Sequence, residues 1–314
     1  MKITVLFPLA LMLWGCSGDF NTPTKLDQAR VLAIQAEPAQ PTLGTATSLR
    51  ALLYLPEGVT ATYSWSWCPL PTSSADAFTC HTDQAGANAL LAQWGVTDAP
   101  PLDLGSGDSV SFTNVFAPAT LAALCSPEVG ASPLLFTCTS TGLPLTINLV
   151  VHTSQGDLPA MTYLYLPVDG TSPPNQNPVI TGLTMGDPAQ AVDGTGSLQV
   201  PRDSHVSIHA VIDQSAAEKL PNPGPDDKPY ERLTLSWYAE AGDFGYQGWG
   251  GVRTGFLGDP SDPNSTFAAA LANTWNTPAA ADYPGRTSRI IVVVRDSRGG
   301  VSWASGLSAL EPTP

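Results

Sequence analysis

The feature that most constrains the fold is an order of strand patterns that occurs twice along the chain. Residues 48–55 carry apolar side chains at every second position, and residues 205–212 repeat this alternation. A period of two is typical of a β-strand with one buried face. In each half a tryptophan-centred segment follows, around Trp65 in the first half and Trp237 in the second. The pattern predicts two similar all-β units in tandem.

The two halves also begin and end alike. Apolar runs at residues 31–36 and 178–184 open them. Each half closes with two strand-like runs joined by a glycine-containing turn, at residues 154–157 and 296–300, and such turns between β-branched runs are hairpin signals. Together with the tryptophan strands, these elements predict two β-sandwiches.

Changes in composition mark the boundaries. A run rich in proline and polar residues at 169–177 has the composition of a linker, and residues 16–30 form a polar stretch that predicts a tether. The first sandwich is therefore expected at residues 31–168 and the second at 178–311. The chain is long enough for two domains of ordinary size.

The first half contains a long insertion, about residues 69–141, that shows little strand pattern. Residues 85–94 and 119–124 are expected to form short helices within it, and Pro118 suits the first turn of the second helix. Because the insertion has few strand signals, we expect it to gain little stability from a sheet core. Disulfides would then have to stabilise it.

Four of the five cysteines, Cys68, Cys80, Cys125 and Cys138, lie in or beside this insertion. Four cysteines allow three pairings, and closeness in the chain favours Cys68–Cys80 and Cys125–Cys138. Each bond would contribute about 2–4 kcal/mol. The alternative is four reduced, buried thiols, which are less typical of an exported chain. A zinc site is disfavoured because no C-x₂-C pair is present.

The order of elements resembles that of immunoglobulin-like or PKD-like β-sandwiches repeated in tandem. Trp65 and Trp237 on the third strands carry this resemblance, together with Arg-Asp-Ser-Arg-Gly-Gly at 295–300 before the last strand. Both halves together resemble uncharacterised surface lipoproteins of myxobacteria and their relatives, whose mature ends often open with a run like residues 30–34. No cysteine lies on the second strand of either half, so the inter-sheet disulfide of true immunoglobulin domains is not expected.

The N-terminal segment has the pattern of an export signal. Lys2 precedes an apolar run at residues 3–14, and the small residue Gly15 stands before Cys16. Leu13, Gly15 and Cys16 resemble the lipobox of bacterial lipoproteins. That resemblance implies removal of the signal peptide and attachment of acyl chains, palmitate among them, to Cys16.

An uncut transmembrane anchor is the alternative, but a spanning helix needs about 20 apolar residues and this run is shorter. We therefore expect residues 1–15 to be a signal peptide. Ser17 follows the cysteine, whereas Asp at that place favours inner-membrane retention in enterobacterial lipoproteins. The expected location is thus the bacterial envelope, at the outer membrane, with the face left open. Several acyl chains would provide stable anchoring.

The charge of the chain excludes some partners. Twenty-seven acidic residues stand against 13 Lys and Arg, a formal net charge of −14. Such a surface repels phosphate backbones, so no nucleic-acid partner is expected. It also disfavours electrostatic attachment to anionic lipid, which leaves the acyl chains on Cys16 as the membrane contact.

No pattern in the chain predicts catalysis. Gly107-Asp108-Ser109 resembles the nucleophile block of SGNH-type esterases, which also need a general base, usually a histidine near the end of the domain. The last histidine here is His209, and no Asp-x-x-His precedes any of the four histidines. A turn built from Gly, Asp and Ser is the favoured interpretation.

No pattern predicts a resident metal or cofactor either. His205 and His209 would share one strand face about 13 Å apart, too far for two zinc bonds of roughly 2.0–2.1 Å. Asp226, Asp227 and residues 258–264 offer oxygen ligands, but neither group has EF-hand spacing. We expect solvated loops there, with calcium binding as the alternative.

The most distinctive loop runs from residue 242 to residue 258 and combines aromatic residues with glycines. Its aromatic residues are Phe244, Tyr246, Trp249 and Phe256. Aromatic rings on such a loop can stack on sugar rings or on a partner protein, because they bury area with few rotors to freeze. The favoured interpretation is nonetheless that the rings fold back and cap the end of the sandwich. The loop is the best candidate contact surface in the sequence.

The sequence therefore predicts a lipid-anchored, exported protein without catalytic activity. Its expected role is a structural, adhesive or interaction module at the cell envelope, with a protein or a glycan as the unknown partner. The alternative is a carbohydrate-binding accessory lipoprotein that uses the aromatic loop at 242–258.

Overall fold

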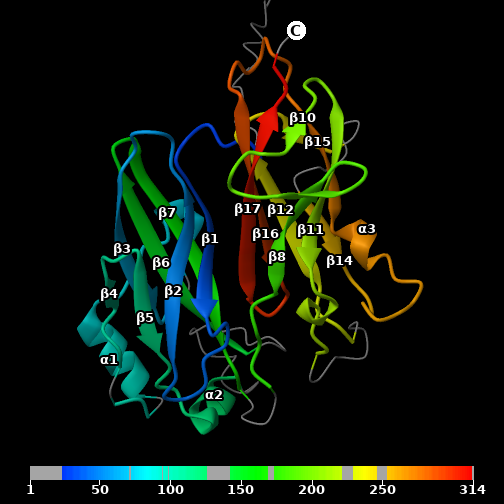
Figure 1. Cartoon of the computed structure of the whole chain (residues 1–314). Coiled ribbons are helices and arrows are strands. Elements are labelled where there is room, and N and C mark those ends of the chain that lie inside the picture. The colour runs from blue at the N-terminus through cyan, green and yellow to red at the C-terminus, as the bar shows by residue number, and fades with distance from the viewer. Residues whose placement is uncertain are drawn as a thin grey trace, which may run out of the picture.

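The computed structural model contains two β-sandwiches that lie side by side, one blue to green and one green to red in Figure 1. The predicted all-β class with two sandwiches is confirmed. The structure describes residues 23–70, 72–93, 95–97, 99–125, 142–168, 173–220, 229–245 and 253–312.

The first sandwich is built from a three-stranded and a four-stranded sheet, both antiparallel. The three-stranded sheet has the order β1 (Arg30–Glu37), β2 (Ala46–Tyr54), β5 (Ser109–Thr113). The four-stranded sheet has the order β4 (Asp103–Gly105), β3 (Ala61–Cys68), β6 (Leu143–Thr153), β7 (Gly156–Leu166). Trp65, Trp67 and Phe112 are among the largest side chains buried between these sheets.

The second sandwich is built from two five-stranded sheets. One has the order β10 (Gln199–Val200), β17 (Val301–Leu310), β16 (Thr287–Arg295), β12 (Leu233–Ala239), β14 (Arg253–Phe256). The other has the order β13 (Asp243–Phe244), β15 (Ala272–Asn276), β11 (His205–Ile212), β8 (Ile180–Met185), β9 (Gln190–Val192). Trp237 and Trp275 are fully buried between them.

Helices are short and lie outside the sheets. They are α1 (Gln84–Ala92), α2 (Pro118–Leu124), α3 (Phe267–Ala270) and the 3₁₀ turns η1 (Ser74–Asp76) and η2 (Gln214–Ala216). The two helices predicted in the insertion correspond to α1 and α2, and Pro118 lies in the first turn of α2 as expected. The side chain of Asp83 caps α1 by accepting the backbone N–H of Gly86.

The two tryptophans that suggested a repeat have equivalent places. Trp65 on β3 and Trp237 on β12 are both buried, each in the core of its own sandwich. A buried indole N–H needs an acceptor. That of Trp65 donates to the carbonyl of Gly107 at 2.9 Å, and that of Trp237 to Oγ1 of Thr254 at 2.9 Å. The Gly107 turn between β4 and β5 thus supports the first core.

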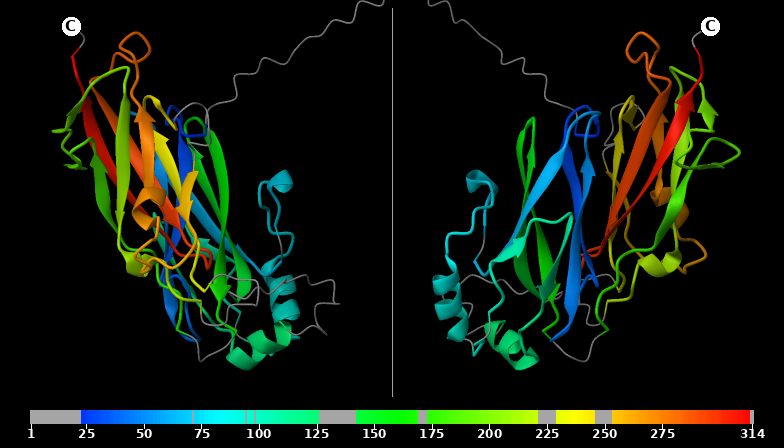
Figure 2. Two further views of the ribbon diagram at one scale, coloured as in Figure 1. Left: turned by 90° about the vertical axis from the view of Figure 1, so that its right-hand side faces the viewer. Right: turned by 60° about the vertical axis from the view of Figure 1, so that its left-hand side comes forward.

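The structure corrects the expectation that the insertion at 69–141 gains little from a sheet core. Its residues form β4 and β5, which pair with β3 and β2, one in each sheet of the first sandwich. Leu91 of α1 and Leu121 of α2 are buried in the first core. Figure 2 shows these two helices, in cyan and green, at the lower end of the first sandwich. Because β4 and β5 are short, an alternation along the sequence cannot reveal them.

One of the two favoured disulfides is present. Cys68, the last residue of β3, is bonded to Cys80 with 5.6 Å between the Cα atoms. Cys125 is also disulfide-bonded. Cys138 lies outside the described residues, so its pairing with Cys125 stays a prediction. The confirmed bond ties the segment that carries η1 back to the end of a core strand.

Replacement of Cys80 by Ala should lower the free energy of unfolding by about 2–4 kcal/mol, because the closed loop no longer restricts the unfolded chain. Urea unfolding under non-reducing conditions measures this loss. Ser74→Ala, an exposed change within the same loop, should stay within about 0.5 kcal/mol of the wild type. Equal midpoints for Cys80→Ala and the wild type would contradict the stabilising role of the bond.

Candidate functional site at the junction of the two sandwiches

The two sandwiches share a third apolar core, here called the junction cluster. It contains buried residues of both sandwiches and of the segment before β1. Its buried members are Leu26, Leu32, Ala33, Tyr54, Ile291, Val293 and Val301. Leu52, Tyr238 and Trp303 pack against them. The sandwiches are therefore joined through a dry contact.

Strand β16 explains how this contact arises. Ile290, Val292 and Val294 point into the core of the second sandwich, whereas Ile291 and Val293 point the other way into the junction cluster. All five are at most 2% exposed. A strand covered on both faces reads as a continuous apolar run rather than an alternation. The run at 290–294 was therefore the signal in the sequence that could have revealed a second covered face.

A seam of polar contacts accompanies the junction cluster. The amide of Gln35 on β1 donates to the carbonyl of Val301 on β17 and accepts from Nε of Arg50 at 2.6 Å. The guanidinium of Arg50 lies 4.7 Å from the ring centre of Trp303. Arg295 donates to the carbonyl of Leu32 at 2.7 Å. The contact between Arg50 and Gln35 lies within the first sandwich, and the other three contacts join the two sandwiches.

The N-terminal residues form a strap across both sandwiches. The strap consists of residues 23–29, and its Leu26 is 1% exposed in the junction cluster. Ala239 of β12 donates to the carbonyl of Thr24 at 2.9 Å and accepts from the N–H of Leu26 at 2.8 Å. From Pro23 onward the predicted tether at 16–30 is thus packed. Its earlier residues lie outside the described part of the chain.

The predicted linker is also part of the junction where it is described. Residues 173–177 follow the undescribed 169–172, and Asn175 is fully buried. Its backbone N–H donates to Oε1 of Gln40 at 2.9 Å. Asn177 donates to the carbonyl of Ala36 at 2.7 Å. Both partners belong to the first sandwich, so this linking segment is docked rather than free.

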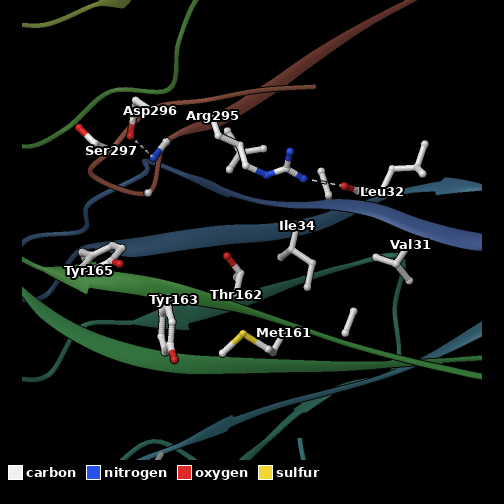
Figure 3. A pocket seen from close by; sticks show the side chains of 15 residues that line it. Val31, Leu32, Ile34, Met161, Thr162, Tyr163, Tyr165, Arg295, Asp296 and Ser297 are labelled. Atoms are coloured by element: carbon white, nitrogen blue, oxygen red, sulfur yellow. Dashed lines mark hydrogen bonds between the residues drawn. The ribbon is translucent and has the colours of Figure 1, made fainter. Parts of the chain in front are cut away.

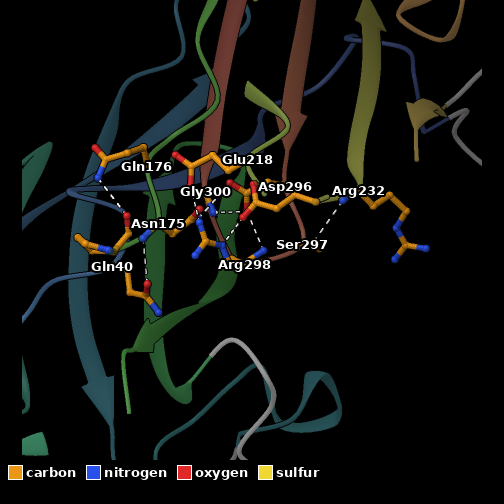
Figure 4. A network of polar contacts seen from close by, with 11 residues as sticks. Gln40, Asn175, Gln176, Glu218, Arg232, Asp296, Ser297, Arg298 and Gly300 are labelled. Carbon is orange, nitrogen blue, oxygen red and sulfur yellow. Dashed lines mark hydrogen bonds and ion pairs between the residues drawn. The ribbon is translucent and has the colours of Figure 1, made fainter. Parts of the chain in front are cut away.

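The turn at 296–300 holds the linking segment from the other side. Oδ1 of Asp296 accepts the backbone N–H groups of Arg298 and Gly300, each at 2.8 Å. Oδ2 accepts the amide of Asn175 at 3.1 Å. A Cβ on Gly300 would lie 2.1 Å from the Asp296 carboxylate, so only glycine fits there. The Arg-Asp-Ser-Arg-Gly-Gly motif thus has a structural role, shown in Figure 4.

A cavity of about 280 Å³ opens beside this turn, between β1 and β7 (Figure 3). Leu32 and Ile34 line it from β1, Met161 and Tyr163 from β7, and Arg295 from the end of β16. Tyr163 is 45% exposed at the cavity. Polar groups share the lining with these aliphatic and aromatic side chains, since Asp296 and Ser297 also lie at the cavity.

Two of the four aromatic residues of the candidate contact loop fold back into the sandwich, which is the interpretation that the sequence favoured. Phe244 and Phe256 are 8% and 5% exposed. The ring of Phe244 lies 5.9 Å from that of Trp237, and the ring of Phe256 lies 4.9 Å from that of Phe267. These two rings belong to the second core because β13 and β14 carry them into it. Tyr246 and Trp249 lie outside the described residues.

The two histidines of β11 have separate hydrogen-bond partners. His205 contacts Asn276 at 2.6 Å, and His209 contacts Ser207 at 2.9 Å.

In the 258–264 segment, Oδ1 of Asp259 accepts hydrogen bonds from the backbone N–H and the hydroxyl of Ser261. The hydroxyl bond is the largest cause of the lowered pKa of Asp259.

Within the described ranges, no group of three or more His, Cys, Asp or Glu could hold a metal ion. Asp226 and Asp227 lie outside them. None of the helices in those ranges is long and apolar enough to cross a membrane.

Comparisons with known proteins identify no family. No family model and no curated protein matches the chain. Among solved structures, the three N-terminal domains of the outer capsid protein Hoc of bacteriophage RB49 match at 11% identity and a TM-score of 0.21, over 91% of this chain and 71% of that one. Murine CEACAM1b matches at 11% identity and a TM-score of 0.22, over 90% of this chain and 100% of that one. A Ca²⁺-stabilised ice-binding adhesin of an Antarctic bacterium matches at 13% identity and a TM-score of 0.21, over 93% of this chain and 51% of that one.

With TM-scores this low, these likenesses support no inference about function. The two-sandwich architecture rests on the strand pairings themselves.

Leu26→Ala should lower the free energy of unfolding by about 2–5 kcal/mol, because it leaves a cavity in the junction cluster. Urea unfolding of the full chain measures the change. Leu43→Ala is the matched control: the same substitution at a side chain that is 52% exposed should alter stability by no more than about 0.5 kcal/mol. Similar small losses for both variants would show that the strap is not a structural part of the junction.

Proposed function

We propose that this chain is a lipid-anchored envelope protein whose paired sandwiches serve as a non-catalytic structural or interaction module, of the kind the sequence resembles in myxobacterial surface lipoproteins. The observation that supports a rigid module is the junction, where the apolar cluster, the strap and the linking segment join the sandwiches. A body that moves as one unit can present a fixed surface to a protein or glycan partner.

The strap also limits how far the module would stand from a membrane. Six residues, 17–22, separate Cys16 from Pro23. Fully extended, six residues span about 20 Å. The strap, at the dark blue start of the coloured chain, and the C-terminal end of β17 lie toward the same end of the molecule, and α1 and α2 lie at the opposite end (Figures 1 and 2). Anchored through Cys16, the module would present the α1–α2 end away from the lipid.

Anchoring is tested by expressing the full chain with its leader in a bacterium that processes lipoproteins. The wild type should enter the detergent phase, and mass spectrometry should find acyl chains on an N-terminal Cys16. Cys16→Ser should move the protein to the aqueous phase, since more than one acyl chain is needed for stable anchoring. Cys80→Ala, which changes a disulfide cysteine, should stay in the detergent phase. An unmodified Cys16 in the wild type would refute the proposal.

The carbohydrate-binding alternative now depends on Tyr246 and Trp249, because Phe244 and Phe256 are buried in the second core. If these two rings bind sugar, Trp249→Ala should abolish binding on a glycan array, since stacking on an aromatic ring supplies much of such a contact. Trp303→Ala, a tryptophan of the junction, serves as the control that should retain binding. Absence of glycan binding by the folded wild type would remove this alternative.

A further inference from the structure

The turn between β16 and β17 gathers more carboxyl groups than its single cation can balance. Arg298 is 4% exposed; its Nε donates to Glu231 and its Nη2 to Glu218. Asp296 of the same turn lies beside them (Figure 4). We call these four residues the carboxyl cluster. With every group ionised, one guanidinium would face three carboxylates, a net charge of −2 in a largely buried site.

The three carboxyl groups are not equally suited to ionisation. Asp296 accepts three N–H donors, two from the backbone and one from Asn175. The side chain of Glu218 is 28% exposed, so water reaches it. Glu231 is fully buried, and its Oε2 has no hydrogen-bond partner among the described residues. Glu231 is therefore the group for which ionisation is least favourable.

The electrostatics agree with this geometry. Burial, followed by the charge of Asp296, raises the pKa of Glu231 to about 8, although Arg298 opposes the shift. Burial also raises the pKa values of Glu218 and Asp296. At neutral pH the carboxyl cluster therefore retains a proton, and Glu231 holds it.

No other charged group among the neighbouring elements replaces that proton. The linking segment contributes the neutral amides of Asn175 and Gln176. The first sandwich contributes Gln40 and Tyr165, and burial, with the charge of Asp296 as a lesser cause, raises the pKa of that phenol above its ordinary value. The guanidinium of Arg232 points away from the cluster in Figure 4. Lys219 lines the neighbouring cavity beside Glu218 and Arg298 but has no ion pair with the cluster among the described residues.

The cluster is coupled directly to the docking of the sandwiches. Asp296 holds Asn175, whose backbone N–H donates to Gln40 of the first sandwich. Asn177 accepts the N–H of Val301, just after the turn, and donates to the carbonyl of Ala36. Any displacement of the turn therefore acts on the linking segment and on its contacts with β1.

We propose that the carboxyl cluster is a pH-sensitive latch on the junction. While it retains one proton, its net charge is −1 and the linking segment stays docked. Loss of that proton at alkaline pH leaves a buried charge of −2, displaces the turn and frees the two sandwiches to move relative to one another.

The direction of the pH effect follows from proton linkage. The pKa of Glu231 in the folded chain, about 8, lies above its ordinary unfolded value of about 4.3. The folded state thus binds the extra proton between these values, and its stabilisation is lost as pH rises through 8. As pH increases from about 4.3 toward 8, the folding equilibrium constant should decrease by up to about tenfold per pH unit.

Urea unfolding and small-angle scattering of the full chain between pH 6 and pH 9.5 test the latch. The wild type should lose stability as described and increase its radius of gyration above pH 8. Glu231→Gln keeps an acceptor for Arg298 but cannot ionise, so its free energy of unfolding and its radius of gyration should change less with pH than those of the wild type. Glu57→Gln, an exposed change, should retain the wild-type response. Identical pH profiles for the wild type and Glu231→Gln would overturn the proposal.

A measurement on the wild type alone keeps the proposal falsifiable if Glu231→Gln does not fold. With glutamate labelled by carbon-13 at the carboxyl, one resonance should titrate above pH 7 while exposed glutamates titrate near their ordinary values. That titration should coincide with the increase in the radius of gyration. A set of glutamates that all titrate below pH 6, or a radius that stays constant to pH 9.5, would overturn the latch.

Discussion

The burial of β16 on both faces is the constraint on which the rest of the structure depends. Alternate side chains of this strand fill the second core and the junction cluster, and both sets are excluded from water. Burial of apolar surface contributes about 25 cal/mol per Å², so a strand of this composition favours a partner on each face. The first sandwich supplies that partner through β1, with Leu32 and Ala33. The strap and the linking segment then cover the edges of the contact.

The arginines show how the chain satisfies its irregular backbone. Arg202 donates to three carbonyls, those of Glu311, Tyr283 and Gly285, at 2.7–2.9 Å. Arg295 donates to the carbonyl of Leu32 across the junction. A guanidinium has several donors in a fixed planar arrangement, which suits it to gather carbonyls from different segments. Because few cations are present and some are used this way, the charge of −14 is little compensated at the surface.

The same scarcity of cations gives the carboxyl cluster its character. Arg298 has to balance Glu218, Glu231 and Asp296 together. A buried cluster of this kind stays stable when a proton replaces the missing cation. The junction therefore combines an apolar contact, whose stability does not depend on pH, with a polar turn, whose stability depends on the protonation of the carboxyl cluster.

Local features were predictable because their causes are local. The alternation at 205–212, the hairpin turns at 154–157 and 296–300, and the Cys68–Cys80 bond, which spans twelve residues, all depend on neighbours in the chain. The strands β13 and β14, which carry Phe244 and Phe256, could not be predicted, since their glycine-rich loop has no period and they pair with strands elsewhere in the chain.

The sequence by itself determined the all-β class, the duplication and the position of the hairpins, since each follows from side-chain period and turn chemistry within a few residues. Only the tertiary structure decided that the sandwiches are docked, that residues 23–29 form a strap, and that Arg298 faces three acids. These contacts join distant residues, as Gln35 and Val301 do across 266 positions. A strand pattern records that a face is apolar, but it does not record which distant surface covers that face.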